Sequence, residues 1–361
     1  MPRDEPGTRL PLKADHYELR IRPDSPNLLL IFPGAMKGEH GDLARRYRSQ
    51  LPASRLCYTN LRPEWERGGF PGLLASSAEM LEEVKRLVAQ SGARRVFALG
   101  ISYGGFGALL AGCALGAERI VVLSGEGALG LPGTRSEAVL RGRLPDHVLT
   151  DLRPVIAARG AGEIHMFCGE RDPRDMIAAS YLADLPGVRQ HVLRGVGHNV
   201  LLHFREYGGM GALLAGTVSG RIDPAALPRR AVHDLRGEAG ALLRAGFAAL
   251  GDADGPAAEA AFRQLARALP ESPVGWAGLG RALARQGRME AAAEAYRAAL
   301  ALDEDPATVL GIVAPLRALR RHGEALALLD RVLRAGPENP RLEHLRSQVA
   351  AEAGAPATLA A

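Results

Sequence analysis

The chain has 361 residues, of which 47% are apolar and 5% aromatic. This length and composition exclude a small disulfide-stapled module and a disordered chain, and they favour a globular protein of two domains. The net charge of +5 comes from arginines scattered among acids, so no nucleic-acid partner is expected. The chain shows no apolar run of membrane-spanning length and no secretory signal at its start, which predicts a cytoplasmic protein without a membrane span.

Short β-rich runs alternate with helical stretches between residues 16 and about 217. Several of the runs are continuously apolar, which predicts a largely parallel sheet with helices on both faces. A helix with apolar residues at i, i+3 and i+4 spacing is expected after Ser76 or Ser77. The candidate strands are His16–Ile21, Leu28–Phe32, Arg55–Thr59, Arg95–Leu99, Arg119–Leu123, Glu163–Phe167 and Arg189–Leu193.

After about residue 235 the sequence is helical in period and repeats itself. Trp276-Ala-Gly-Leu-Gly-Arg-Ala-Leu283, followed by Ala292 and Tyr296, resembles a tetratricopeptide repeat, although Leu283 replaces the usual Tyr. Ala258 and Phe262 lie one such repeat length upstream, and Ala325 and Leu329 lie nearly the same distance downstream. The alternative is a plain Ala-rich helical bundle. The predicted organisation is a first domain at 1–217, a linker at 218–235 that contains Gly and Pro residues, and an all-α repeat domain at 236–354.

The stretch Gly100-Ile-Ser102-Tyr-Gly104 lies between an apolar strand and a helix of small residues. A serine hydroxyl needs exposure at a sharp turn, a neighbouring base and oxyanion donors before it becomes a good nucleophile. Glycines at 100 and 104 suit such a turn, because they remove side chains that would collide across it. The pattern predicts that Ser102 is a nucleophile; the alternative is a packing turn with an idle serine.

With this motif, residues of about 16 to 217 resemble an α/β-hydrolase, whose triad runs Ser, Asp or Glu, then His along the chain. Gly169-Glu-Arg-Asp172 is similar to the loop that carries the family's acid, and Gly195-Val-Gly-His198 to the turn that carries its base. The resemblance implies that His198 is the base. It favours Asp172 as the acid, with Asp175 as the alternative if the loop is longer. Whichever carboxylate is not the acid is expected to cap a helix that begins near Met176.

The oxyanion hole of such an enzyme needs two backbone donors. The residue after the nucleophile, Tyr103, supplies the first candidate. The second is expected after the strand Leu28–Phe32, at Ala35 with Met36 in reserve. Pro33 stands where related enzymes have histidine.

No cofactor and no metal is implied by the sequence. The three cysteines show no metal-ligand spacing. Gly125-Glu-Gly-Ala-Leu-Gly130 fits a G-x-G-x-x-G pattern, but Leu-Pro-Gly-Thr follows it instead of a helix that could hold a phosphate. Residues 125–161, where this family inserts a lid, contain no long apolar helix, which predicts an open site.

The leading hypothesis is a serine hydrolase that cleaves an ester, thioester or related acyl bond through an acyl-Ser102 intermediate. The repeat region is expected to dock a protein partner or a second subunit. Two alternatives remain open: acyl transfer by the same residues, and an inactive hydrolase fold that serves as a binding scaffold.

Overall fold

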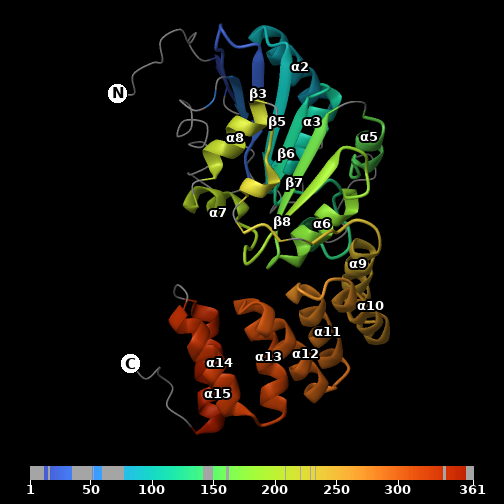
Figure 1. The fold of residues 1–361 in the computed structure, drawn as a ribbon, viewed down its shortest axis with the longest axis vertical. Coiled ribbons are helices and arrows are strands. Elements are labelled where there is room, and N and C mark those ends of the chain that lie inside the picture. The colour runs from blue at the N-terminus through green and yellow to red at the C-terminus, as the bar shows by residue number, and fades with distance from the viewer. Residues whose placement is uncertain are drawn as a thin grey trace. The chain divides into compact units, whose positions relative to one another are not determined.

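Two compact units, Met1–Gly237 and Glu238–Ala361, make up the chain (Figure 1). The computed structural model describes residues 12–14, 17–34, 51, 53–58, 77–140, 149–159, 162–207, 209–219, 221–227, 229–231, 233–335 and 339–354.

The sheet of the first unit has the strand order β1-β2-β4-β3-β5-β6-β7-β8. β2 pairs antiparallel with β1 and β4, and the other neighbours are parallel. The strand order reverses between β3 and β5, and open α/β sheets generally bind their ligands at the carboxyl ends of the strands at such a point. The strands are β1 (Leu12–Ala14), β2 (Tyr17–Arg20), β3 (Asn27–Phe32), β4 (Ser54–Tyr58), β5 (Arg95–Ile101), β6 (Arg119–Leu123), β7 (Glu163–Gly169) and β8 (Val188–Leu193).

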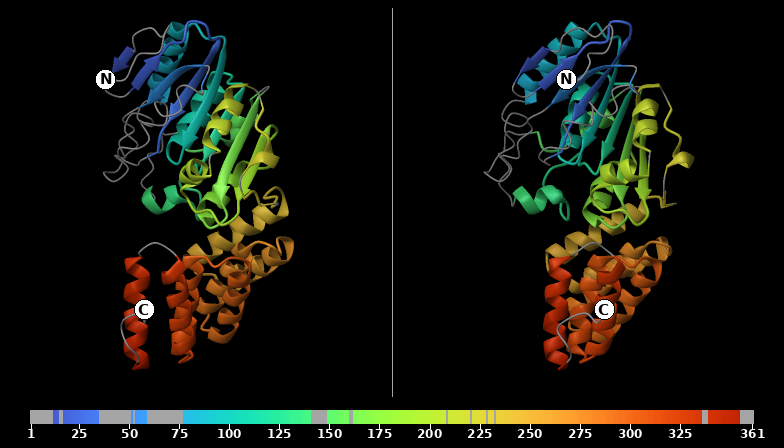
Figure 2. Two further views of the ribbon diagram at one scale, coloured as in Figure 1. Left: turned by 60° about the vertical axis from the view of Figure 1, so that its left-hand side comes forward. Right: turned by 90° about the vertical axis from the view of Figure 1, so that its left-hand side faces the viewer.

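Helices cover both faces of this sheet (Figure 2). Helices α2 (Ser77–Ser91), α3 (Gly104–Ala114) and α6 (Pro173–Leu182) lie on one side, and α7 (Val200–Glu206) and α8 (Met210–Ser219) pack on the other. Between β6 and β7 the described helices are short, α4 (Arg135–Leu140) and α5 (Arg153–Ala157). This is the α/β-hydrolase architecture that the sequence predicted.

Burial on both faces explains why the central strands read as continuous apolar runs. In β3, Leu28 and Leu30 face one layer of helices while Leu29 and Ile31 face the other, and all four are buried. The seven candidate strands each coincide with an observed strand within one or two residues at each end. β1, which is shorter than the other strands, was not predicted.

The segment predicted as a linker packs against the first unit over part of its length. Helix α8 extends to Ser219, and Ile222 belongs to the core between the sheet and helices α7 and α8. The backbone N–H of Ala231 donates to the carbonyl of Val192 on β8. Apolar residues interspersed among the Gly and Pro therefore hold this segment on the sheet.

Two buried histidines face each other across β7 and β8. Nδ1 of His165 lies 2.9 Å from Nε2 of His191, and the rings stack with centroids 5.1 Å apart. Burial lowers the pKa of His165 to about 4, and burial together with the neighbouring His165 lowers the pKa of His191 to about 3. The neighbouring charged groups are Glu163, Arg119, Arg189 and Arg230. Both imidazoles are therefore neutral at pH 7.

This pair predicts a loss of stability on acidification. Between about pH 6.5, where an unfolded histidine titrates, and pH 4, the unfolded chain binds protons that the folded chain cannot. The free energy of unfolding should fall by roughly 1 to 2 kcal/mol for each imidazole between pH 7 and pH 5. Denaturant titrations of the double variant His165→Gln/His191→Gln should show a smaller fall in the free energy of unfolding between these pH values. His344→Gln, at an exposed position, should match the wild type. An equal slope in all three proteins would contradict the assignment.

The second unit consists of helices that pack on their neighbours along the chain. Asp254, Asp305 and Asn339 cap three of them by accepting hydrogen bonds from backbone N–H groups. Among the described residues, none of the helices combines the length and the apolar character that a membrane span requires. The helices are α9 (Glu238–Gly251), α10 (Gly255–Ala268), α11 (Pro273–Arg285), α12 (Met289–Leu302), α13 (Pro306–Ala318), α14 (His322–Ala335) and α15 (Pro340–Ala353).

One contact recurs in this unit: an aromatic ring lies between glycines of the preceding and the following helix. Phe262 on α10 packs against Gly246 and Gly278, and Tyr296 on α12 packs against Gly280 and Gly311. A Cβ on Gly280 would lie 2.8 Å from Tyr296, and one on Gly311 would lie 2.6 Å from it. The separation in sequence between Phe262 and Tyr296 equals that between Gly246 and Gly280. The sequence period therefore corresponds to a repeated packing contact.

Adding a methyl group in this contact should destabilise the second unit. Gly278→Ala would drive a Cβ into the buried Phe262 ring, and such overpacking costs about 1 to 3 kcal/mol. Gly323→Ala is the matched control, because its added Cβ would meet no atom within 4 Å beyond its chain neighbours and the backbone of its own helix, and alanine favours a helix. Thermal unfolding should show a lower midpoint for Gly278→Ala alone. Equal midpoints would refute the role of the aromatic–glycine contact.

Candidate active site

Ser102 lies on the turn that joins β5 to α3. Its φ is +50°, in the left-handed region that non-glycine residues seldom occupy. Two backbone hydrogen bonds hold the turn: Ser102 N–H donates to Leu123 on β6 (2.7 Å), and Gly105 N–H donates to the Ser102 carbonyl (2.9 Å). A strained serine between a strand and a helix is the geometry of a nucleophile elbow.

The two glycines of the motif are required by close packing. A Cβ on Gly100 would lie 2.6 Å from the Gly104 carbonyl oxygen, and one on Gly104 would overlap the Phe32 carbonyl of β3. The turn therefore lies against the end of the neighbouring strand. Larger residues at either position would push helix α3 away and move the serine.

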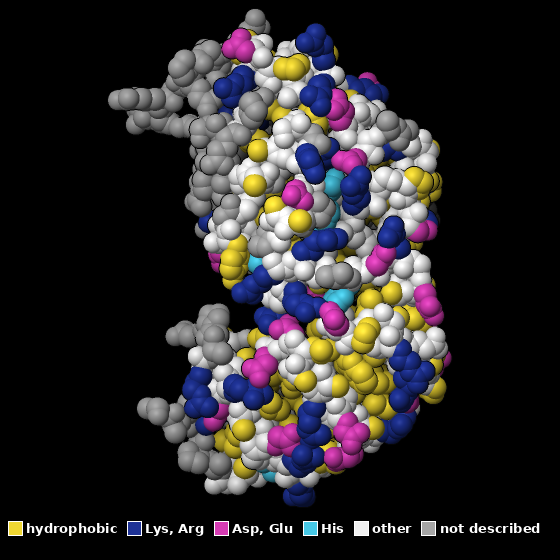
Figure 3. Space-filling model, in the orientation of Figure 1, with side chains coloured by type: hydrophobic (Ala, Val, Ile, Leu, Met, Phe, Trp, Pro, Cys, Tyr) yellow, Lys and Arg dark blue, Asp and Glu magenta, His cyan; other side chains and the backbone are white. Residues whose placement is uncertain are grey.

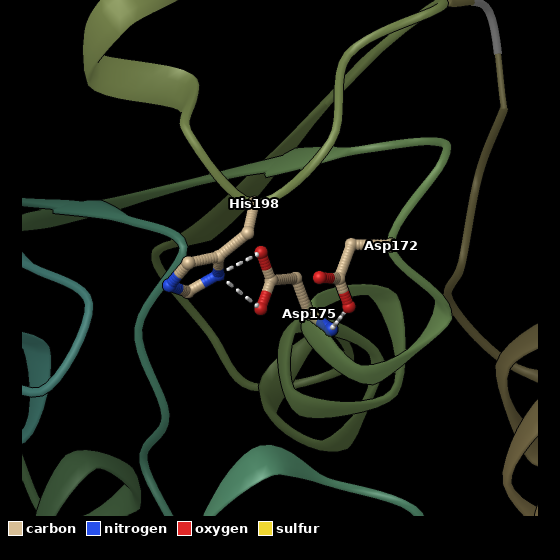
Figure 4. Close-up of side chains that lie close together, drawn as sticks. All are labelled: Asp172, Asp175 and His198. Atoms are coloured by element: carbon tan, nitrogen blue, oxygen red, sulfur yellow. Dashed lines mark hydrogen bonds and ion pairs between the residues drawn. The ribbon is translucent and has the colours of Figure 1, made fainter. Parts of the chain in front are cut away.

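The structure brings Ser102, His198 and Asp175 together in a continuous line. Ser102 Oγ lies 2.9 Å from Nε2 of His198. Nδ1 of the same ring lies 2.8 Å and 3.0 Å from the two carboxylate oxygens of Asp175 (Figure 4). His198 comes from the base loop, residues 194–199 between β8 and α7. Asp175 lies in the first turn of α6.

Asp172, which the sequence favoured as the acid, has different partners. It is the N-cap of α6 and accepts hydrogen bonds from the backbone N–H groups of Arg174 and Asp175. Its other oxygen forms an ion pair with Arg135 at 2.5 Å. The helix begins at Pro173, earlier than the expected start near Met176, so Asp175 rather than Asp172 faces the imidazole.

Burial shapes the electrostatics of Asp175. Its side chain is 3% exposed, and this desolvation raises the pKa of its carboxyl above the usual range, against the opposing effect of the hydrogen bond from His198. Asp172 also raises this pKa, while Arg135, with Nη2 at 4.0 Å from Asp175 Oδ1, lowers it. A buried carboxylate at Nδ1 fixes the tautomer that leaves Nε2 free to accept a proton.

The predicted oxyanion donors are only partly within the described residues. Tyr103 follows Ser102 directly and is the N-cap of α3, so its backbone N–H lies at the positive end of that helix. Ala35 and Met36 lie outside the described residues. Gly34, the last described residue of their loop, is close to Ser102: a Cβ on it would lie 3.3 Å from the Ser102 Cβ.

A small pocket that opens to solvent adjoins Ser102. Sequence reasoning missed three polar residues that line it: Ser124, Glu126 and Arg135. Ser124 has a φ of +52°, and its buried Oγ has no hydrogen-bond partner within the described part of the chain. The same holds for Nε of Arg135. Phe106 and Leu129 supply apolar walls.

The dismissed G-x-G-x-x-G segment follows β6 and supplies two of the pocket-lining residues, Glu126 and Leu129. Glu126 accepts hydrogen bonds from the backbone N–H groups of Arg135 and Ser136. Burial raises the pKa of the Glu126 carboxyl. This segment follows β6, which lies beside β5 in the sheet, so its start lies at the same edge as Ser102. That position is the sequence signal that could have placed it at the site.

Asp172, Asp175 and His198 are also the residues whose spacing would admit a cation, since their ligand atoms lie within 4.8 Å of one another. The contacts that these three side chains make with other residues explain their positions without a cation. Nδ1 of His198 bonds to Asp175, and Asp172 is engaged by Arg135 and by the start of α6.

No protein-family model and no curated protein matches this chain. Similar solved structures include MenH from S. aureus, with 11% identity over 56% of this chain and 98% of that chain, and a TM-score of 0.41. Carboxylesterase CesB from Bacillus subtilis has 14% identity over 60% and 93%, with a TM-score of 0.40. The capsule O-acetyltransferase of Neisseria meningitidis serogroup A has 17% identity over 55% and 91%, with a TM-score of 0.41. At these values none of them assigns a reaction or a substrate to this chain.

The two aspartates should separate cleanly in experiment. Asp175→Asn keeps the shape but not the charge of the histidine's partner, and loss of this orienting carboxylate should slow acylation by roughly 10⁴-fold. Asp172→Asn retains a capping side chain, so its rate should stay within about tenfold of wild type. The rate constant for fluorophosphonate labelling measures both. A larger loss in Asp172→Asn would reverse the assignment.

Proposed function

We propose that this protein is a serine hydrolase that cleaves an ester, thioester or related acyl bond through an acyl-Ser102 intermediate. The observation that carries the proposal is the hydrogen-bonded line from Ser102 Oγ through His198 to Asp175, set on a strained turn. Ser124 shares the left-handed backbone, but Ser102 also lies against an imidazole that is backed by a buried carboxylate, which a serine without a catalytic role does not need.

In the acylation step, Ser102 Oγ attacks the substrate's carbonyl carbon while its proton passes to Nε2 of His198. The carbonyl oxygen becomes an oxyanion, for which we propose the N–H of Tyr103 and that of Ala35 or Met36 as donors. Collapse of this intermediate breaks the bond to the alcohol or thiol. His198 gives its proton to that leaving group, and Asp175 stabilises the imidazolium in between.

In the deacylation step, water enters the place of the leaving group. His198 takes one proton from it, the hydroxyl adds to the acyl carbon, and the acid departs as Ser102 Oγ recovers its proton. The pocket lining combines apolar Phe106 and Leu129 with polar Ser124, Glu126 and Arg135. A small pocket favours a short acyl group over a long hydrocarbon chain.

For the second unit we propose tetratricopeptide-like repeats that dock a protein partner or a second subunit. The aromatic–glycine contact, which recurs at the period of the sequence repeat, supports this proposal, because stacked helix pairs present extended surfaces. Figure 3 shows apolar side chains gathered over α11 and α12 on the face in view.

Fluorophosphonate labelling tests the catalytic proposal. The wild type should be labelled and Ser102→Ala should not, because the probe reacts only with an activated hydroxyl. Ser347→Ala, at an exposed serine of α15, is the matched control and should react as the wild type does. An unlabelled wild type, or equal labelling of Ser102→Ala, would refute the proposal. Products formed from an ester with an added alcohol or amine separate hydrolysis from acyl transfer.

A further inference from the structure

The chain just before the second unit forms a strap along the edge of the sheet; the strap is defined here as the described residues 229–231 and 233–235. The backbone N–H of Arg194 donates to the carbonyl of Arg229 at 2.7 Å, and that of Ala231 donates to Val192 at 2.8 Å. These bonds extend the sheet beyond β8 at the point where the base loop begins. The strap is therefore attached to the segment that carries His198.

The strap also holds the acid-side loop, which is defined here as residues 170–172 between β7 and α6. Nε2 of His233 donates a hydrogen bond to Oε1 of Glu170, the first residue after β7. The side chain of Glu170 is 0% exposed and that of His233 is 5% exposed. Oε2 of Glu170 lies 3.8 Å from Nε of Arg194 on the base loop. A carboxyl group this deeply buried depends on its donors, because burial without them costs several kcal/mol.

Glu170 stands where the two functional loops meet. Its backbone N–H donates to Leu193, and that of Arg171 donates to Val196, both at 2.9 Å. A Cβ on Gly169 would overlap the carbonyl oxygens of Val196 and Gly197, which shows how closely the loops pack. Any shift of Glu170 must therefore move the base loop relative to α6, and with it the contact between His198 and Asp175.

A third contact of the strap reaches the helix after the base loop. The guanidinium of Arg229 stacks over the ring of Tyr207, the C-cap of α7, with 5.0 Å to the ring centroid. The strap thus touches β8, the acid-side loop and the end of α7. β8 and α7 flank the base loop that carries His198, and the acid-side loop packs against it.

Building on the proposed function, we propose that His233 and Glu170 are positioning residues for the triad: their hydrogen bond holds the acid-side and base loops in the register that aligns Asp175, His198 and Ser102. They touch none of the reacting atoms. Their effect on rate comes through geometry, and misplacing a catalytic group by about 1 Å can cost about 10²-fold. The segment that leads into the second unit is thereby part of the support of the active site.

A double-mutant cycle tests this role with the full chain. His233→Ala should lower the rate constant for fluorophosphonate labelling by roughly 10- to 100-fold. His233→Gln should recover most of it, because the glutamine amide reaches about the position of the imidazole Nε2 and donates to Glu170. In an Asp175→Asn background, His233→Ala should lower the rate constant little further. His233 acts by aligning the Asp175 carboxylate with His198, and this background has already lost that carboxylate. His344→Ala, at an exposed histidine of α15, is the control and should label as the wild type does.

Three outcomes would overturn the inference. The first is a labelling rate constant of His233→Ala equal to that of the wild type, and the second is no recovery of the rate constant in His233→Gln. The third is an equal fold-loss from His233→Ala in the Asp175→Asn background, which indicates a general loss of structure. Thermal unfolding shows whether each variant folds. If His233→Ala does not fold, Glu170→Gln takes its place in the cycle, and its labelling rate constant is compared with that of the wild type. A wild type that is never labelled refutes the proposed function itself, whereas labelling that ignores His233 refutes only the positioning role.

Discussion

The site depends on the close approach of the β5–α3 turn to the end of β3. Only glycine at 104 lets these backbones meet, and glycine at 100 leaves room for the start of helix α3; Ser102 lies between them in a left-handed conformation. The strain is held by bonds to β6 and α3, so the hydroxyl projects from a rigid turn. Its partner on the other side, His198, reaches it because β7 and β8 continue the same parallel sheet and release their loops at the same edge.

Much of this arrangement follows from the sequence. Continuous apolar runs predicted the strands, since a sheet covered on both faces buries every residue, and the order of serine, aspartate and histidine predicted which loops would meet. The pattern of the loop did not decide whether Asp172 or Asp175 pairs with His198. They lie within one helical turn of each other, so the start of α6 decides which one faces the imidazole. Asp172 precedes Pro173, and proline at the first helical position marks the preceding residue as the cap.

The features that were not predicted rest on contacts between distant segments. Glu170 and His233 are far apart in the sequence, and no local pattern links them. Glu126 lines the pocket from a segment whose spacing resembled a different motif, and Ser124 and Arg135 lie before and after that segment. The strap was interpreted as part of a connector because Gly and Pro precede it, yet paired backbone groups hold it on the sheet. In the second unit, by contrast, the period in the sequence has a direct counterpart in the repeated aromatic–glycine contact.

Rapid-quench mass spectrometry of the protein mixed with p-nitrophenyl acetate detects a covalent intermediate on Ser102 if one forms. We expect one acetyl group per chain on the peptide that contains Ser102, formed with the first burst of p-nitrophenol and absent from Ser102→Ala. Ester consumption without this adduct, an adduct on another residue, or no reaction at all would contradict it.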